Sequence, residues 1–134
     1  MSKTSDLFLV YPAVFTPEAK GGYLIEFPDI QGAFTGINTD DISYGIAMAE
    51  EALGLTLADY IENADSVNPP SNINEVKVPE NAFVTLIKTN VSKYLNNDKL
   101  VKKTLTIPQW ADRKAKKQKL NFSALLTNAI LQQK

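Results

Sequence analysis

Residues Val101–Lys134 read VKKTLTIPQWADRKAKKQKLNFSALLTNAILQQK, and the interpretation of the whole chain depends on this stretch. Its first part alternates as a strand does, because successive side chains of a strand point to opposite faces. Leu105 and Ile107 share one face, which Lys103 interrupts. The polar side chains of the opposite face are those of Lys102, Thr104 and Thr106. The pattern predicts a short strand with one apolar side.

Two helices are predicted after this strand. Pro108 ends the strand and suits the first position of a helix, because its φ is fixed and its missing N–H is not needed there. The first helix should run to about Gln118, and it is basic. Asn121 is a suitable N-cap for the second helix. The apolar residues that follow recur with the period of an amphipathic helix: Phe122, Leu125, Leu126, Ala129 and Ile130.

A strand and two helices of this size cannot bury their apolar side chains alone. The chain has no cysteine that could form a disulfide. We therefore predict that two chains pair their strands into one antiparallel ribbon over a shared core of four helices. This arrangement resembles the ribbon-helix-helix DNA-binding fold, in which the outer face of the ribbon enters the major groove.

The resemblance to this fold implies which residues would meet DNA. The groove-facing side chains would be Lys102, Thr104 and Thr106. The N-terminus of the second helix, at Asn121, Phe122 and Ser123, would hold a phosphate through backbone N–H groups and the helix dipole. The alternative is that KKTLTI is a half-solvated edge strand and that the last helix is an ordinary amphipathic helix.

The composition narrows the class of protein. The 134 residues make one ordinary domain or two small ones, and a hydrophobic content of 44% supports a packed core. Without cysteine or histidine, the chain lacks a thiolate zinc site, a cysteine nucleophile, the commonest metal ligand and the usual general base. No cofactor is predicted. The N-terminal apolar run is too short for a signal peptide and nothing spans a membrane, so a cytoplasmic location is expected.

The net charge of −1 conceals a strong segregation of charge. Residues 1–98, called the body, contain 5 Lys/Arg and 14 Asp/Glu, a formal charge of −9. Residues 99–134, called the tail, contain 9 Lys/Arg and one acidic residue, a formal charge of +8. Such a division predicts a polyanion as the partner of the tail and a basic protein as the partner of the body.

The body shows the signals of a mixed sheet and helix domain. Their β-branched and aromatic residues predict strands at 7–15, 23–27, 33–37 and 83–88. A proline-rich stretch at 66–81 should be a loop. A helical turn or two is predicted at 90–95, before a polar hinge.

A long helix is predicted between the third and fourth strands, capped by Asn38 or Thr39. Its expected buried stripe is Ile42, Ile46, Ala49, Leu53, Leu57 and Ile61. Gly45 and Gly54 inside it indicate close packing on the sheet. The side chain of Glu50 is expected to face water.

Several short motifs of the body, taken together, resemble the HicB antitoxin family. They are Tyr11-Pro12-Ala13-Val14, Gly21-Gly22-Tyr23, Phe27-Pro28-Asp29-Ile30-Gln31-Gly32 and Glu51-Ala52-Leu53. The resemblance covers nearly the whole chain, and a ribbon-helix-helix tail is one of the C-terminal forms of that family. One departure is Ala33, where relatives often have cysteine.

The resemblance implies an α+β chain with two functional parts. Residues 1–95 would form a partial RNase H-like β-β-β-α-β domain that binds a HicA-type toxin, an RNA-cleaving protein. Residues 96–100 would be a hinge, and residues 101–134 a ribbon-helix-helix domain (β-α-α) that dimerises and binds operator DNA to repress the chain's own operon. A homodimer is expected, or a tetramer if the N-terminal domains also pair. The chain is not expected to be an enzyme.

Acidic residues of the body allow other interpretations. Glu26 and Asp29 are candidates for the rim of the toxin-binding surface, although Asp29 also suits a turn. A nuclease would need several carboxylates that converge on two metal ions, and Asp40 and Asp41 are better explained as helix caps. A ribbon-helix-helix repressor whose acidic domain senses a small ligand, without a toxin, is the remaining alternative.

Overall fold

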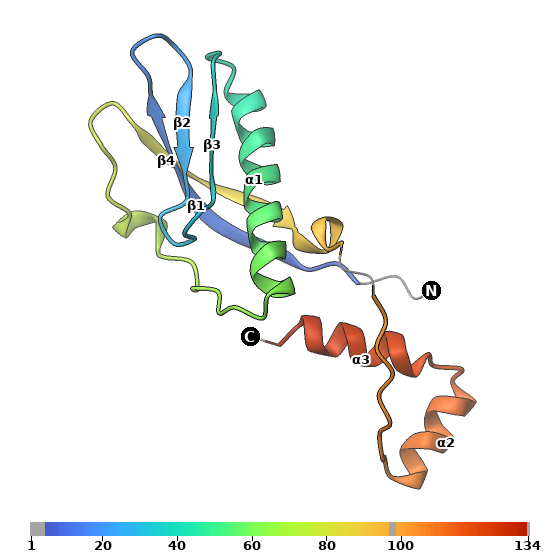
Figure 1. Ribbon diagram of the computed structural model, residues 1–134. Coiled ribbons are helices and arrows are strands. Elements are labelled where there is room, and N and C mark those ends of the chain that lie inside the picture. The colour runs from blue at the N-terminus through green and yellow to red at the C-terminus, as the bar shows by residue number, and fades with distance from the viewer. Residues whose placement is uncertain (1–4, 97–98, 134) are drawn as a thin grey trace.

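The computed structural model describes residues 5–96 and 99–133 of the chain. A four-stranded antiparallel sheet carries the long helix on one face, and two shorter helices lie beyond one end of this unit (Figure 1). The strands are β1 (Phe8–Pro17), β2 (Tyr23–Glu26), β3 (Phe34–Ile37) and β4 (Phe83–Asn90). The α-helices are α1 (Ile42–Glu62), α2 (Gln109–Lys117) and α3 (Phe122–Leu131). The predicted α+β class and order of elements in the body are confirmed, whereas the division into RNase H-like and ribbon-helix-helix parts stays a prediction.

The sheet has the strand order β3-β2-β1-β4, so β1 lies between β2 and β4. Gly21 and Gly22 in the β1–β2 turn both have positive φ, and a Cβ on Gly22 would lie 2.0 Å from the carbonyl oxygen of Ile37. Only glycine fits there. Pro12 is tolerated because β2 pairs with β1 only from Val14 to Pro17.

The register of the strands separates two faces of the sheet. Phe34 pairs with Glu26, Glu26 with Val14, and Val14 with Val84. Directly paired residues share a face, so the even-numbered strand residues lie on one face and the odd-numbered residues on the other. The odd-numbered residues pack under α1 and are buried: Tyr11, Ala13, Phe15, Ile25, Ile37 and Ile87. We call the even-numbered side the open face.

The start of α1 corrects the predicted cap. The N-cap is Asp41, whose carboxylate accepts a hydrogen bond from the backbone N–H of Tyr44 at 3.4 Å. Thr39 instead accepts a bond from the backbone N–H of Asp41 at 3.2 Å. The carboxylate of Asp40 accepts a bond from the backbone N–H of Gly22 at 3.1 Å, which ties the helix start to the β1–β2 turn.

The buried face of α1 also differs from the predicted stripe. The buried residues are Gly45, Ala49, Leu53, Gly54, Leu57 and Ala58, whereas Ile46 is 42% exposed. The helix turns its two glycines toward the sheet. A Cβ on Gly45 would meet Phe15 and Ile37 at 3.0 Å, and one on Gly54 would meet the ring of Tyr94 at 2.2 Å. The prediction that these glycines allow close packing is confirmed.

The connection from α1 to β4 crosses from the helix side to the open face. It contains a short 3-10 helix, Ile73–Glu75, within the predicted loop. A second 3-10 helix, Val91–Tyr94, follows β4 and confirms the helical turn predicted there. It packs against α1, so this last part of the body is held against the helix.

The tail contains both predicted helices but not the predicted strand. Asn121 caps α3 as predicted, since its side chain accepts a bond from the backbone N–H of Ala124 at 3.0 Å. Pro108 is the N-cap of α2 rather than its first residue. Residues 99–107 form no strand, because a strand needs a hydrogen-bonded neighbour and a single chain offers none to them. In the part of the chain that the structure describes, no helix is long and apolar enough to span a membrane.

Candidate functional site

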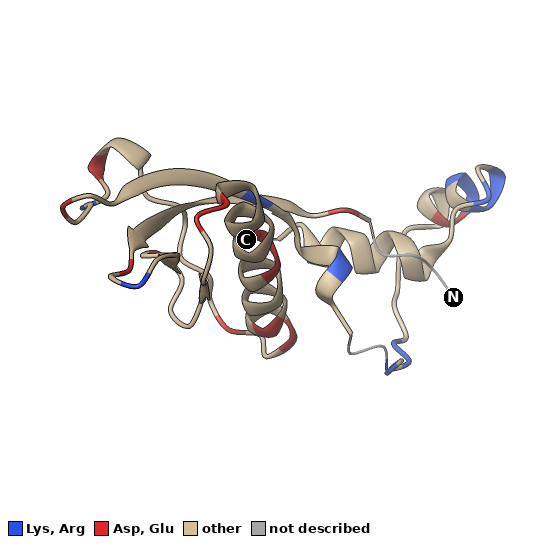
Figure 2. Cartoon of the chain, turned by 90° about the horizontal axis from the view of Figure 1, so that it is seen from above, with Lys and Arg blue, Asp and Glu red and all other residues tan. Residues whose placement is uncertain are grey.

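The segregation of charge along the sequence is also a segregation in space. Figure 2 shows most Asp and Glu residues distributed over the sheet, α1 and the connecting loop, whereas α2 at the far end carries mostly Lys and Arg. One chain therefore presents two chemically different surfaces. The acidic one suits a cationic protein and the basic one suits a polyanion.

A groove of about 510 Å³ lies where the loop before β4 crosses the open face of the sheet. Its lining includes Val14, Glu26 and Asp29 from the sheet and its turns, and Glu75, Val76 and Lys77 from the loop. Three carboxylates and one ammonium thus line the groove together with apolar side chains such as those of Val14 and Val76. The structure brings together Glu26 and Asp29, the two residues that the sequence suggested for the toxin-binding rim.

Asp29 holds the wall of this groove in place. Its carboxylate accepts hydrogen bonds from the backbone N–H of Ser71, at 2.8 Å, and from the Ser71 hydroxyl. Its backbone oxygen accepts a bond from the side-chain amide of Asn68 at 3.0 Å. The Tyr11 hydroxyl donates to the backbone oxygen of Asn68, and burial together with the nearby Asp29 charge raises the pKa of Tyr11. Asp29 therefore positions the loop, whereas Glu26 is exposed on β2.

A second polar cluster joins α1 to the segment that leads into the tail. Glu50, predicted to face water, is only partly exposed. Its carboxylate accepts hydrogen bonds from the hydroxyls of Thr89, at 2.6 Å, and Tyr94, at 2.9 Å. Burial of Tyr94 and its hydrogen bond to Glu50 raise the pKa of Tyr94 to about 12. The prediction for Glu50 was wrong because its partners come from β4 and the 3-10 helix, which helical periodicity does not reveal.

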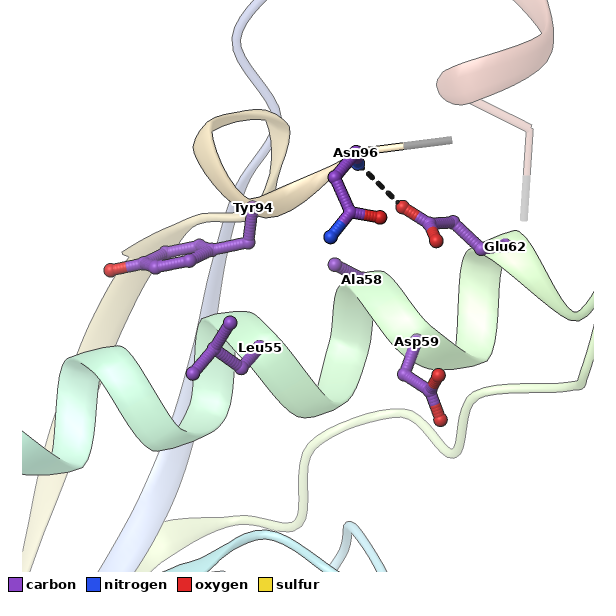
Figure 3. A pocket seen from close by; sticks show the side chains of 6 residues that line it. All are labelled: Leu55, Ala58, Asp59, Glu62, Tyr94 and Asn96. Atoms are coloured by element: carbon purple, nitrogen blue, oxygen red, sulfur yellow. Dashed lines mark hydrogen bonds between the residues drawn. The ribbon is translucent and has the colours of Figure 1, made fainter. Parts of the chain in front are cut away.

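A small pocket of about 220 Å³ lies beside this cluster, between α1 and the Tyr94–Asn96 segment (Figure 3). The Glu62 carboxylate accepts a hydrogen bond from the backbone N–H of Asn96 at 2.7 Å. Two carboxylates of α1, those of Glu50 and Glu62, therefore hold the end of the body against the helix. No local pattern of the sequence indicated either contact.

The predicted DNA-binding residues belong to two segments of the tail, away from the groove. Lys102, Thr104 and Thr106 are exposed in the extended segment before α2. Asn121, Phe122 and Ser123 form the exposed start of α3. The basic character of α2 is confirmed, since Lys114, Lys116 and Lys117 occupy its last turn, where they also complement the helix dipole.

The tail also leaves large apolar side chains uncovered in the single chain. Trp110 is 69% exposed, and the other exposed apolar residues include Leu105, Ile107, Leu125 and Ile130. Two hydrogen bonds connect α3 to the start of the body, from the Ser5 backbone to Asn128 at 2.8 Å and from Gln132 to the Asp6 backbone at 3.3 Å. An apolar surface of this extent is typical of an interface with another protein chain.

The acidic residues considered for nuclease chemistry have structural partners. Asp40 and Asp41 take part in the hydrogen bonds at the start of α1. Within residues 5–96 and 99–133, no group of three or more Asp or Glu side chains is placed to hold a metal ion.

Comparison with known proteins identifies the family. The family described as HicB-like antitoxin of bacterial toxin–antitoxin systems matches residues 11–130. A chain of a toxin–antitoxin complex from Streptococcus pneumoniae is 33% identical, covers 96% of this chain and 100% of its own length, and has a TM-score of 0.59. The antitoxin HicB of Burkholderia pseudomallei shares the fold, with 22% identity, coverage of 92% and 97%, and a TM-score of 0.53. No curated protein matches the sequence.

The surfaces described above belong to a protein of the antitoxin class. The match of the family over most of the chain shows more specifically that this chain belongs to the HicB-like antitoxin family. The sequence-based assignment to that family is confirmed.

Proposed function

We propose that this chain binds and neutralises a HicA-type mRNA-cleaving toxin and represses its own operon by binding operator DNA. The observation that carries the proposal is its membership of the HicB-like antitoxin family. The likeness to a chain of a toxin–antitoxin complex supports a toxin partner. The body, with a formal charge of −9, supports a basic partner and fast association steered by complementary charge.

Neutralisation would follow from covering the active site of the toxin. The body is a packed domain with a preformed groove, so it offers a rigid surface at little cost in ordering. Glu26 would contact the toxin directly from β2. Asp29 would act through the loop that it holds to the turn after β2.

Operator binding would use two tails. Pairing residues 101–107 of two chains would supply the strand partner that a single chain lacks, and it would cover the exposed apolar residues of the tail. Lys102, Thr104 and Thr106 of each chain would then face the bases, and the start of α3 at Asn121, Phe122 and Ser123 would hold a phosphate. The result would be a homodimer, or a tetramer if the bodies also pair.

The test is to mix the purified full chain with the protein encoded next to it and with the DNA upstream of both. We expect suppression of RNA cleavage by the neighbouring protein and a retarded band with the upstream DNA. DNA binding without any interaction with the neighbouring protein would favour the alternative, a ligand-sensing repressor without a toxin. Failure of both assays would refute the proposal.

A further inference from the structure

The open face of the sheet is unusually apolar for a face on which no α-helix of residues 5–96 and 99–133 packs. Antiparallel sheets with one solvated face normally place polar side chains there. Here the exposed, even-numbered residues are mostly large and apolar: Phe8, Val10, Leu24, Phe34 and Leu86. Phe34 is 63% exposed and Leu86 is 51% exposed. Exposed apolar side chains gathered on one face indicate an interaction surface.

The loop before β4 already covers the middle of this face. Val14 lies in the centre of the sheet and is 6% exposed, and it lines the groove beside the loop. In one row across the open face, Val14 of β1 pairs with Glu26 of β2, and Glu26 pairs with Phe34 of β3. Leu24 is two residues before Glu26 on the same strand and the same face. We call Leu24, Glu26 and Phe34 the Phe34 patch.

We propose that the Phe34 patch and the adjoining groove dock a protein whose contact surface has Lys and Arg side chains around an apolar centre. This inference rests on the proposed function, in which that protein is the toxin. The apolar centre of the partner would cover Phe34 and Leu24. Its cations would meet the carboxylates of Glu26 and Glu75 at the groove.

The charge of the body decides between this occupant and a second copy of the chain. Two bodies pressed together through this face would bring together two domains that each carry a formal charge of −9. Like charges across an interface are unfavourable, whereas a cationic partner gains from the same field. The tail of the chain also offers a separate apolar surface for self-association, which leaves the open face to another protein.

Phe34 has the properties of an anchoring residue. Its backbone is fixed by pairing with Glu26 of β2, so little conformational freedom remains to be lost on binding. Aromatic residues, phenylalanine included, are enriched at the core of protein interfaces. The more distant Phe8 contacts Lys88, whose ammonium lies 4.6 Å from its ring centre, and we leave this end of the face outside the proposed contact.

The experiment compares full-length variants for binding to the purified, catalytically inactivated toxin encoded beside the chain. Phe34→Ser should weaken binding by about tenfold or more. Ile46→Ser is the matched control, because Ile46 is an exposed apolar residue of α1 on the other side of the sheet, and it should change affinity less than about twofold. Glu26→Lys should slow association, and this effect should shrink at high salt.

Circular dichroism and thermal unfolding should show that each variant is folded, as expected for exposed positions. If wild-type protein binds no such toxin, the proposed function fails. If wild-type protein and both patch variants bind equally well, only the location of the surface is wrong. A lower oligomeric state of Phe34→Ser in analytical ultracentrifugation, with toxin binding unchanged, would assign the patch to a second copy and overturn the inference.

Discussion

Replacing Gly54 with alanine should destabilise the body, although alanine is the better helix former. The new methyl carbon would lie 2.2 and 2.4 Å from ring carbons of Tyr94 and 2.7 Å from the hydroxyl oxygen of Thr89. Both side chains donate hydrogen bonds to the Glu50 carboxylate, at 2.9 and 2.6 Å. The ring of Tyr94 must therefore move, and its bond to Glu50 is lost with it.

The expected magnitude follows from three contributions. Overpacking a core costs about 1–3 kcal/mol. Loss of a hydrogen bond to a charged group costs about 1.5–3 kcal/mol. Replacement of glycine in a helix returns about 1 kcal/mol. The free energy of unfolding should thus fall by about 1.5–5 kcal/mol, which urea denaturation monitored by circular dichroism measures.

Substitution of Tyr94 isolates the contribution of its ring to this effect. In Tyr94→Ala protein, the ring that opposes the new methyl group is absent and only the Thr89 hydroxyl remains close to it, so Gly54→Ala should be much less destabilising. The two substitutions should show a coupling energy of at least about 1.5 kcal/mol. If Gly54→Ala stabilises the wild-type protein by about 1 kcal/mol, as at an open helix position, then the close contact with Tyr94 is not present in solution.

Three further predictions concern the pH dependence, the tail and the DNA contact. The pKa of Tyr94 in the folded protein is raised to about 12 from an ordinary 10. The stability that the Tyr94 hydroxyl contributes should therefore be complete below pH 10 and lost as the pH rises toward 12. Over this pH range, the difference in melting temperature between the wild-type protein and Tyr94→Phe should shrink. Removal of residues 99–134 should abolish DNA binding and leave a cooperatively unfolding domain; an unfolded circular dichroism spectrum would contradict the two-part organisation. Thr104→Ala should weaken binding to operator DNA by ~1–3 kcal/mol per lost base contact, and it should weaken binding to random DNA much less. Lys116→Ala should weaken binding to both DNAs alike and reduce the salt slope by about one per phosphate contact. Equal loss on both duplexes for Thr104→Ala would show that the ribbon does not read sequence.

The strands and helices of the body were predictable because each is specified locally. Apolar and β-branched runs mark the strands, and Gly21 and Gly22 mark the turn between β1 and β2. The cap of α1 was not predictable in the same way. Four candidate residues stand in a row, Asn38 to Asp41, and tertiary contact decides among them, since Asp40 is bonded to the turn at Gly22.

Periodicity failed where glycine replaces an apolar side chain at the contact. The predicted stripe included Ile46 because the pattern scores hydrophobic side chains, but the sheet packs against Gly45 next to it. The partners of Glu50 are 39 and 44 residues away in the sequence, so no local pattern could have indicated them. The strand predicted before α2 is not formed in the single chain, and it stays a prediction that would require a second chain.

The candidate site was predictable in its chemistry but not in its division of roles. Glu26 and Asp29 do line one groove, as their common assignment to a binding rim implied. Asp29, however, is bonded to Ser71, which is 42 residues away, and it therefore shapes the groove. The apolar open face could be recognised only after the register had assigned even-numbered residues to it.

These observations suggest separate roles for charge and apolar contact in recognition. The excess of acid is spread over the whole body, and some of its carboxylates are engaged within the fold, as Glu50 and Asp29 are. Such a diffuse field acts at long range and mainly raises the rate of encounter, in a manner that salt weakens. The lifetime of a complex depends on close contacts, which the exposed Phe34 and Leu24 can supply. Substitutions of carboxylates should therefore change association rates, and substitutions in the apolar part of the patch should change dissociation rates.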